Sequence, residues 1–213
     1  MKRNTVAERR AEILETTCRV VVERGFGATR ISDVANKLGV STGLIHYHFD
    51  SKEQLFAEAL RHAADADLAR LTAEVAKVDS PLARLDQIFK LYSPEEAEPG
   101  WMLWIDGWGE ALRSKELKQI SQELDLHWKN LLQSIIGEGV AAGEFTCADP
   151  NAAAWRLAAL LDGLGVQVTV HDDLISRDEL LGWVRGAACR ELNLPADAFE
   201  PKSTKRPAKH AGG

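Results

Sequence analysis

The most informative part of the chain reads Ser32-Asp-Val-Ala-Asn-Lys-Leu-Gly-Val-Ser-Thr-Gly-Leu-Ile-His-Tyr-His-Phe49, and it predicts two short helices joined by a tight turn. We expect Thr29 to cap the first helix and Gly39 to end it, because glycine adopts the left-handed conformation without steric cost. Ser41 then caps the second helix, Thr42–His48. The apolar side chains of the first helix recur at helical spacing and share one face: Ile31, Val34, Ala35 and Leu38.

The second helix is poorly suited to burial. Ile45 and the following Phe49 turn inward, whereas the remaining surface is small, polar or aromatic. Such a helix suits the major groove of DNA, into which a helix-turn-helix inserts its second helix while the first crosses the backbone. Two helices around a glycine also occur in all-α proteins that bind no DNA, so this pattern alone leaves both interpretations open.

The start of the next helix favours DNA binding. Ser51 and Gln54 form a capping box, and Lys52 lies beside the backbone amides of that helix start. Amides at a helix N-terminus bind phosphate, and a lysine next to them adds a positive charge. The chain therefore offers a helix that can enter a groove, followed directly by one that can hold the DNA backbone.

The same residues resemble a known signature. The stretch Val40-Ser-Thr-Gly-Leu-Ile-His-Tyr-His-Phe-Asp-Ser-Lys-Glu-Gln-Leu55 resembles the helix-turn-helix signature of the TetR family of bacterial repressors. His46 and Leu44 depart from the residues usual in that family, so no relative supplies the operator sequence. Three upstream segments match the same domain in order: Ala11-Glu-Ile-Leu14, Gly25-Phe-Gly-Ala-Thr29 and Val34-Ala-Asn-Lys-Leu-Gly39.

The resemblance implies an all-α protein in two parts. Residues 1–50 would form a three-helix helix-turn-helix DNA-binding domain, residues 51–195 a larger helical domain for effector binding and dimerisation, and residues 196–213 a disordered tail. The protein would bind a palindromic double-stranded DNA operator as a repressor and leave it when a small hydrophobic or cationic ligand binds. The residues expected to meet DNA are Thr29, Arg30, Ser32, Ser41, Thr42, Gly43, Leu44, His46, Tyr47, His48 and Lys52. Four of these suit phosphate oxygens by residue type: Thr29, Tyr47, His48 and Lys52.

The charge distribution agrees with this division. Residues 1–62 hold ten Lys and Arg against eight Asp and Glu, whereas residues 63–195 hold twelve against twenty-two, so the net charge of −6 comes from the middle of the chain. Because the N-terminal excess is small, affinity for a polyanion would depend on a local basic cluster. That cluster comprises Lys2, Arg3, Arg9, Arg10, Arg30 and Lys52.

Helical periodicity continues through the larger part. Helices 151–170 and 177–192 are apolar over so much of their surface that we expect burial on two sides, one against the core and one against a second copy of the chain. An internal helix pair in a monomer would show the same pattern. The helices expected in all are 6–24, 30–38, 42–48, 52–78, 81–92, 101–113, 115–143, 151–170 and 177–192.

The segment Trp101-Met-Leu-Trp-Ile-Asp-Gly-Trp-Gly-Glu110 suggests a ligand site. Its three tryptophans recur at helical spacing around Asp106, and aromatic faces with a carboxylate suit a lipophilic or quaternary cation through cation–π attraction. The tryptophans could equally be plain core. The resemblance implies a ligand pocket built from the fifth, sixth, seventh and eighth helices. The residues expected to bind the ligand there are Trp101, Trp104, Asp106, Trp108, Trp128, Trp155 and Asp162.

The sequence shows no pattern for catalysis, for a metal or for a cofactor. His46 and His48 are two residues apart on a helix and point in different directions, so they cannot share a metal as an i, i+4 pair does. Three widely spaced cysteines form no disulfide framework, and no signal peptide or membrane segment is evident, which predicts a cytoplasmic protein. Two other classes stay open: a DNA-binding protein without an effector, and a helical enzyme or partner-binding module whose helix-turn-helix is incidental.

Overall fold

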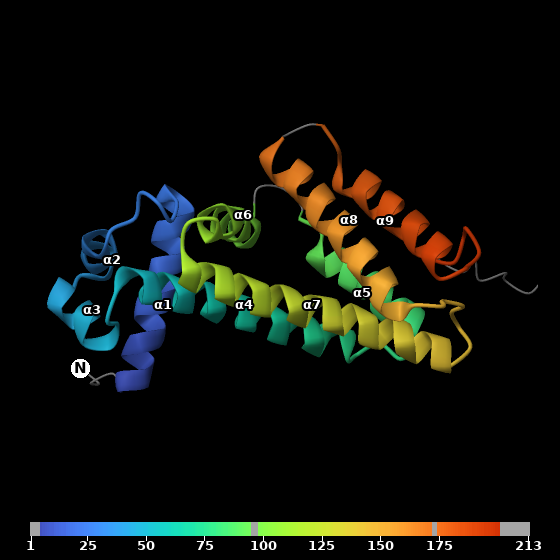
Figure 1. The fold of residues 1–213 in the computed structure, drawn as a ribbon, viewed down its shortest axis with the longest axis horizontal. Helices are drawn as coiled ribbons and strands as arrows, with labels where there is room; N and C mark the ends of the chain where they lie inside the picture. Colours follow the sequence, from blue (N-terminus) through green and yellow to red (C-terminus); the bar gives the residue numbers. More distant parts are fainter. Residues whose placement is uncertain (1–4, 95–97, 172–173, 201–213) are drawn as a thin grey trace, which may run out of the picture.

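The computed structural model describes residues 5–94, 98–171 and 174–200, and within these ranges every regular element is an α-helix (Figure 1). This confirms the predicted all-α architecture, with a small N-terminal part and a larger C-terminal part. The helices are α1 (Val6–Arg24), α2 (Ile31–Leu38), α3 (Thr42–His48), α4 (Lys52–Val75), α5 (Pro81–Tyr92), α6 (Pro99–Ala111), α7 (Lys115–Ala141), α8 (Pro150–Val170) and α9 (Arg177–Glu191).

The molecule is elongated, with α1–α3 at one end and α5, α8 and α9 toward the other (Figure 1). The long helices α4 and α7 pack side by side and connect the two ends. α6 contacts α1 on one side and α8 on the other, and it also packs on α4 and α7. A displacement of α4 or α6 therefore reaches both the N-terminal helices and the larger part.

The turn between α2 and α3 is built as its sequence predicts. Gly39 ends α2 in the left-handed conformation, with φ 73° and ψ 34°. The Ser41 hydroxyl caps α3 by accepting a hydrogen bond from the Leu44 amide. These two residues fix the angle at which α3 leaves α2.

The start of α2 differs from the prediction. Thr29 does not cap the helix, because its side chain is fully buried and its hydroxyl donates to the Gly25 carbonyl at 2.7 Å. Arg30 takes the cap position, and the Asp33 carboxylate accepts from the Arg30 amide at 2.8 Å. Thr29 instead closes the turn that follows α1.

The core of the N-terminal part extends beyond residue 50. Ile45 and Phe49 pack in one cluster with Phe56 and Leu60 from α4 and with Leu103 from α6. The first turns of α4 therefore belong to the core of the N-terminal part. The predicted boundary between residues 50 and 51 falls at a helix start and does not separate two cores.

A second core holds the larger part together, from the C-terminal half of α4 and from α5, α7, α8 and α9. α4 ends at Val75, and α6 begins two residues earlier than predicted, at Pro99. Phe199 packs against Phe89, with ring centres 5.9 Å apart, so the start of the predicted tail folds onto this core. Residues 201–213 lie outside the described residues. Within the described ranges, every helix is too short or too polar to cross a lipid bilayer.

Candidate DNA-binding surface and ligand cavity

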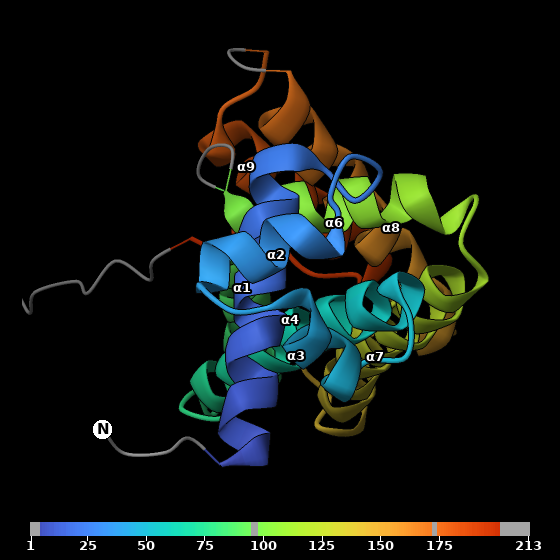
Figure 2. The same cartoon turned by 90° about the vertical axis from the view of Figure 1, so that its left-hand side faces the viewer.

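Helix α3 has a buried anchor and an outward face at the end of the molecule that Figure 2 turns toward the viewer. Ile45 is fully buried and Phe49 is 1% exposed, whereas Tyr47 is 75% exposed. Among the residues predicted to meet DNA, those that are exposed are Arg30, Ser32, Ser41, Thr42, Gly43, His46 and Tyr47. Those that are half-buried are Leu44, His48 and Lys52.

Thr29 is the exception in the predicted set. Its hydroxyl points at the Gly25 carbonyl and the residue has no exposed surface. A fully buried hydroxyl cannot reach a phosphate, so the predicted phosphate contact of Thr29 is wrong. The exposed Arg30 next to it carries the positive charge at this position.

The start of α4 lies directly after α3. The Ser51 hydroxyl accepts from the Gln54 amide at 3.0 Å, as predicted, while the Gln54 side chain accepts from the Asp50 amide at 2.7 Å. Lys52 is the first residue of α4, and its ammonium lies 5.0 Å from the centre of the Phe56 ring. The lysine is thus held close to the helix start, where a phosphate can meet both the ammonium and the backbone amides.

Arg10 has a role that its place in the basic cluster did not suggest. Its guanidinium donates to the carbonyl of His48, the last residue of α3, and to the carboxylate of Glu58 in α4. The same group lies 4.2 Å from the centre of the Phe49 ring. Arg10 therefore joins α1, α3 and α4 and positions the outward helix. Lys2 and Arg3 of that cluster lie outside the described residues.

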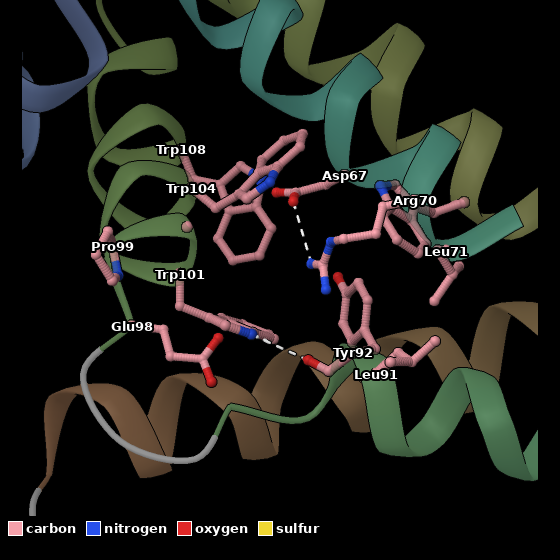
Figure 3. Close-up of a pocket in the computed structure, with 12 residues that line it drawn as sticks. Asp67, Arg70, Leu71, Leu91, Tyr92, Glu98, Pro99, Trp101, Trp104 and Trp108 are labelled. Atoms are coloured by element: carbon pink, nitrogen blue, oxygen red, sulfur yellow. Dashed lines mark hydrogen bonds and ion pairs between the residues drawn. The ribbon is translucent and has the colours of Figure 1, made fainter. Parts of the chain in front are cut away.

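A cavity of about 360 Å³ lies in the larger part, between α4, α5, α6 and α7 (Figure 3). Five aromatic side chains form much of its wall: Tyr92, Trp101, Trp104, Trp108 and Trp128. We call it the main cavity. Four of these are tryptophans that the sequence predicted as ligand-binding residues, and Tyr92 is a wall residue that the sequence did not single out.

The rings of the main cavity hold one another in edge-to-face contacts. The Tyr92 ring centre lies 5.3 Å from that of Trp101 and 4.9 Å from that of Trp128. The Trp101 indole nitrogen donates to the Tyr92 carbonyl at 3.0 Å, which ties the start of α6 to the end of α5. Edge-to-face packing places the positive edge of one ring against the negative face of its neighbour, and such pairs stabilise the aromatic wall.

The charged residues at the main cavity are Asp67, Arg70 and Glu98. Arg70 donates to Asp67 at 3.2 Å, three residues apart on α4, and Figure 3 shows the Arg70 side chain reaching toward Asp67 between the aromatic walls. Asp67 and Arg70 were not predicted from sequence, because α4 was expected only to connect the two parts and the pocket was expected among the fifth to eighth helices. The spacing of two opposite charges on one face of a long helix was the available signal.

A smaller cavity of about 20 Å³, close to the volume that one water needs, adjoins the far side of Tyr92 and Trp128. The Tyr92 hydroxyl donates to the Asp162 carboxylate there at 2.5 Å. Burial raises the pKa of Asp162, and the hydrogen bond from Tyr92 opposes that shift. Burial also raises the pKa of Tyr92 well above its usual value, so the phenol keeps its proton. Asp162 thus lies one ring behind the main cavity and orients Tyr92.

Two other predicted ligand residues lie elsewhere. The Asp106 carboxylate accepts from the Phe26 amide in the turn after α1, so it faces the N-terminal part and not the main cavity. Trp155 is 45% exposed on α8, with the buried Lys129 ammonium 4.1 Å from its ring centre. Asp106 lies among the tryptophans of α6 in sequence, and Trp155 was expected to approach them from a neighbouring helix. The packing of α6 and α8 turns both side chains to other faces.

Both parts of the chain match models of one family of known proteins. Residues 13–59 match the family described as bacterial regulatory proteins, tetR family, and residues 81–202 match the C-terminal domain of BetI-type transcriptional repressors. The chain belongs to the TetR family of bacterial transcriptional regulators. The resemblance seen in the helix-turn-helix residues is confirmed, and the chain is a DNA-binding regulator of transcription.

Individual TetR relatives align over most of the chain. The transcriptional repressor KstR2 of Mycolicibacterium smegmatis is 32% identical over 145 residues, which cover 65% of this chain and 68% of that protein. The regulator BetI of Burkholderia thailandensis is 28% identical over 73% of this chain and 79% of its own length. A transcriptional regulator from Saccharomonospora viridis, solved in complex with choline, superposes with a TM-score of 0.76 at 32% identity, over 84% of this chain and 94% of that one.

Two helices extend from the N-terminal part to the main cavity. α4 begins with Lys52 beside α3 and contributes Asp67 and Arg70 to the main cavity. α6 contributes Trp104 and Trp108 to the cavity, while Asp106 between them holds the turn after α1.

Proposed function

We propose that this TetR regulator is a homodimeric repressor that leaves its operator when a quaternary ammonium compound occupies the main cavity. The observation that carries the proposal is the wall of five aromatic side chains around a space of about 360 Å³. A trimethylammonium group spreads one positive charge over an apolar surface, so aromatic faces hold it better than a single carboxylate does. Each well-placed ring contributes about 0.5–2 kcal/mol to the binding free energy, and the contribution is larger where water is excluded from the site.

The charges around the main cavity support a cationic effector. Asp67 and Glu98 are acidic, and Arg70 is basic and already paired with Asp67. Two acidic side chains and one basic side chain therefore lie at the cavity, which favours a cation over an anion. The match to BetI-type repressors and the choline complex of the Saccharomonospora viridis regulator agree with an effector of this class.

We propose that the exposed face of α3, with its flanking residues, meets the operator. Tyr47, His48 and Lys52 are positioned for phosphates, since they flank the end of α3 and the start of α4. The residues assigned to the groove are Ser32, Thr42, Gly43, Leu44 and His46, with Arg30 and Ser41 beside them. Leu44 suits contact with a thymine methyl group.

We propose that α8 and α9, about residues 151–192, form the contact between two copies. Exposed residues at four-residue spacing on α8, namely Trp155, Ala159 and Gly163, make a stripe of small and aromatic surface. Trp183 on α9 is 47% exposed. Exposing two indole rings to water is unfavourable, and a second copy of the chain that packs on them would bury that surface. The dimer would also present two α3 helices to a palindromic site. Such a regulator acts with the chromosome in the cytoplasm, and its role is regulatory and not catalytic.

Release follows from the position of α4. A ligand that binds between Asp67, Arg70 and the aromatic walls favours one placement of α4, and α4 carries Lys52 at its other end. The ligand must bind the form that does not fit DNA more tightly than the form that does, because equal affinity shifts no equilibrium. A 100-fold loss of operator affinity corresponds to about 2.7 kcal/mol of coupling.

The test uses the full chain and the duplex that it protects in a footprint of the DNA upstream of its gene. Choline and its neutral analogue 3,3-dimethylbutan-1-ol, which have the same shape, are titrated while tryptophan fluorescence and operator retardation in a gel are followed. We expect choline to quench the fluorescence and release the duplex, and the neutral analogue to bind at least tenfold more weakly. Equal binding of the two compounds, or binding without release, would overturn the proposal.

A further inference from the structure

We infer that occupancy of the main cavity strengthens the contact between two copies of the chain, and that the buried Lys129 of α7 transmits this effect from Tyr92 to Trp155. The inference rests on the proposed function, because it connects the effector cavity and the dimer face that are proposed there. It gives a regulatory role to a group of charged side chains on α7 and α8 that lie outside the main cavity.

Tyr92 is where this connection begins, because it belongs to both cavities. Tyr92 and Trp128 line the main cavity and also the cavity of about 20 Å³ behind them, which we call the small cavity. At the small cavity the Tyr92 hydroxyl donates to the Asp162 carboxylate of α8 at 2.5 Å. A ligand that packs against Tyr92 in the main cavity therefore touches a side chain that is bonded directly to α8.

The small cavity joins Asp162 to Lys129, which both line it together with Asp125. Its volume suits one water molecule, to which the carboxylates, the ammonium group and the phenol offer hydrogen bonds. Burial is the main cause of the raised pKa of Asp162, and the positive charge of Lys129 opposes the rise. The ammonium and the carboxylate thus interact across the small cavity, and a water molecule in it completes the contact between them.

Lys129 connects the small cavity to the surface of α8. Its side chain is 8% exposed, and its ammonium pairs with the Asp125 carboxylate one turn earlier on α7. The same ammonium lies 4.1 Å from the centre of the Trp155 ring. A buried ammonium requires close partners to offset the loss of hydration, so the carboxylate and the indole fix its position. Trp155 thus contacts a buried cation, while its exposed surface belongs to the stripe proposed to meet the second copy.

The direction of the effect follows from the order that a ligand imposes. An effector packed against Tyr92 restricts the ring, and the hydroxyl then keeps Asp162, the water and Lys129 in one arrangement. The dimer contact requires Trp155 in a fixed position over Lys129, so a chain that already has this arrangement loses less conformational entropy when it dimerises. The coupling is reciprocal, and the dimer binds the effector more tightly than the monomer by the same factor.

The experiment follows the exchange of subunits between unlabelled and isotope-labelled full chains by native mass spectrometry, with and without saturating choline. A tighter contact slows dissociation, and we expect choline to slow exchange about fivefold in the wild type. In Lys129→Met, which keeps an unbranched apolar stem but removes the ammonium, choline should slow exchange by less than about twofold. Lys129→Arg should restore the effect, because a guanidinium also pairs with a carboxylate and stacks on an indole. Asp162→Asn interrupts the same connection on the Tyr92 side and should lose the effect as Lys129→Met does.

Lys118→Met is the matched control, because Lys118 is exposed on α7 and lines neither cavity. It removes the same charge and should keep the choline effect. A lysine that only stabilises the fold would change the exchange rate equally with and without choline. Calorimetry on the same samples measures choline binding. If choline binds the wild type without slowing exchange, or slows exchange as much in Lys129→Met and Asp162→Asn, the inference is wrong and the proposed function stands. If choline does not bind, or the chain forms no dimer, the proposed function fails and the inference fails with it.

Discussion

Replacing Arg10 by Met tests how α3, the helix proposed to meet the operator, is held. Methionine keeps the apolar stem beside Phe49 but removes the hydrogen bonds to the His48 carbonyl and the Glu58 carboxylate. Because α3 has only seven residues and His48 is its last, these bonds are a large part of what fixes its direction relative to α1 and α4. We expect the variant to fold and to bind the operator more weakly.

The size of the loss follows from the exposure of the groups. Hydrogen bonds to charged groups contribute about 1.5–3 kcal/mol when protected, but the Arg10 and Glu58 side chains are 34% and 30% exposed, which places the two bonds together near 1.5 kcal/mol. In the variant, binding to DNA must itself fix the orientation of α3, and this free-energy cost weakens binding. Each subunit would lose up to about tenfold in affinity, and the proposed dimer with two α3 helices up to about 100-fold.

The assay is fluorescence anisotropy of the operator at a series of salt concentrations, because salt dependence separates positioning from phosphate binding. Arg10→Met should lower affinity at every salt concentration and keep the slope of log affinity against log salt. Lys52→Ala should reduce that slope by about 0.9 for each phosphate that the lysine neutralises in the wild type. Arg19→Met is the control, since it removes the same charge from α1 and its guanidinium donates to Thr16. Wild-type affinity in Arg10→Met, or a slope that falls as it does in Lys52→Ala, would show that Arg10 does not act by positioning α3.

Three further changes test the larger part. Gly165→Ala should lower the free energy of unfolding by about 1–3 kcal/mol and weaken cation binding, because the new methyl group would lie 2.1 Å from the Trp101 ring. Gly137→Ala is the control, since its methyl group would meet nothing within 4 Å, and it should change neither property. Thermal unfolding measures the stability of both variants, and fluorescence titration measures their cation affinity. Trp183→Glu should turn dimer into monomer in light scattering, and a dimer that persists would place the interface elsewhere. Asp106→Ala should leave choline affinity unchanged but reduce the release of operator DNA that choline causes, and full release would show that α6 does not transmit the signal.

The helix-turn-helix could be predicted from sequence because its turn and helix caps depend on residues close together in the chain. Gly39, Ser41 and Ser51 act through hydrogen bonds and backbone angles within a few residues, so the sequence around each of them specifies its effect. Thr29 was misplaced because two local partners compete for its hydroxyl, and the carbonyl of Gly25 in the preceding turn binds it in place of the α2 amides. The position of Arg10 beside the end of α3, in contrast, depends on how α1 packs against α4 in the tertiary structure.

The helix-turn-helix, the helical character of the remaining chain and the tryptophan-rich face of α6 could be predicted from the residues alone, since periodicity and caps depend on neighbours in the chain. The packing of the helices brings Asp67, Arg70 and Tyr92 to those tryptophans and turns Asp106 and Trp155 away from them. A cavity is the space left where several helices fail to fill the volume between them. Its wall therefore depends on the packing of α4, α5, α6 and α7 together, which the residues of any one helix do not specify.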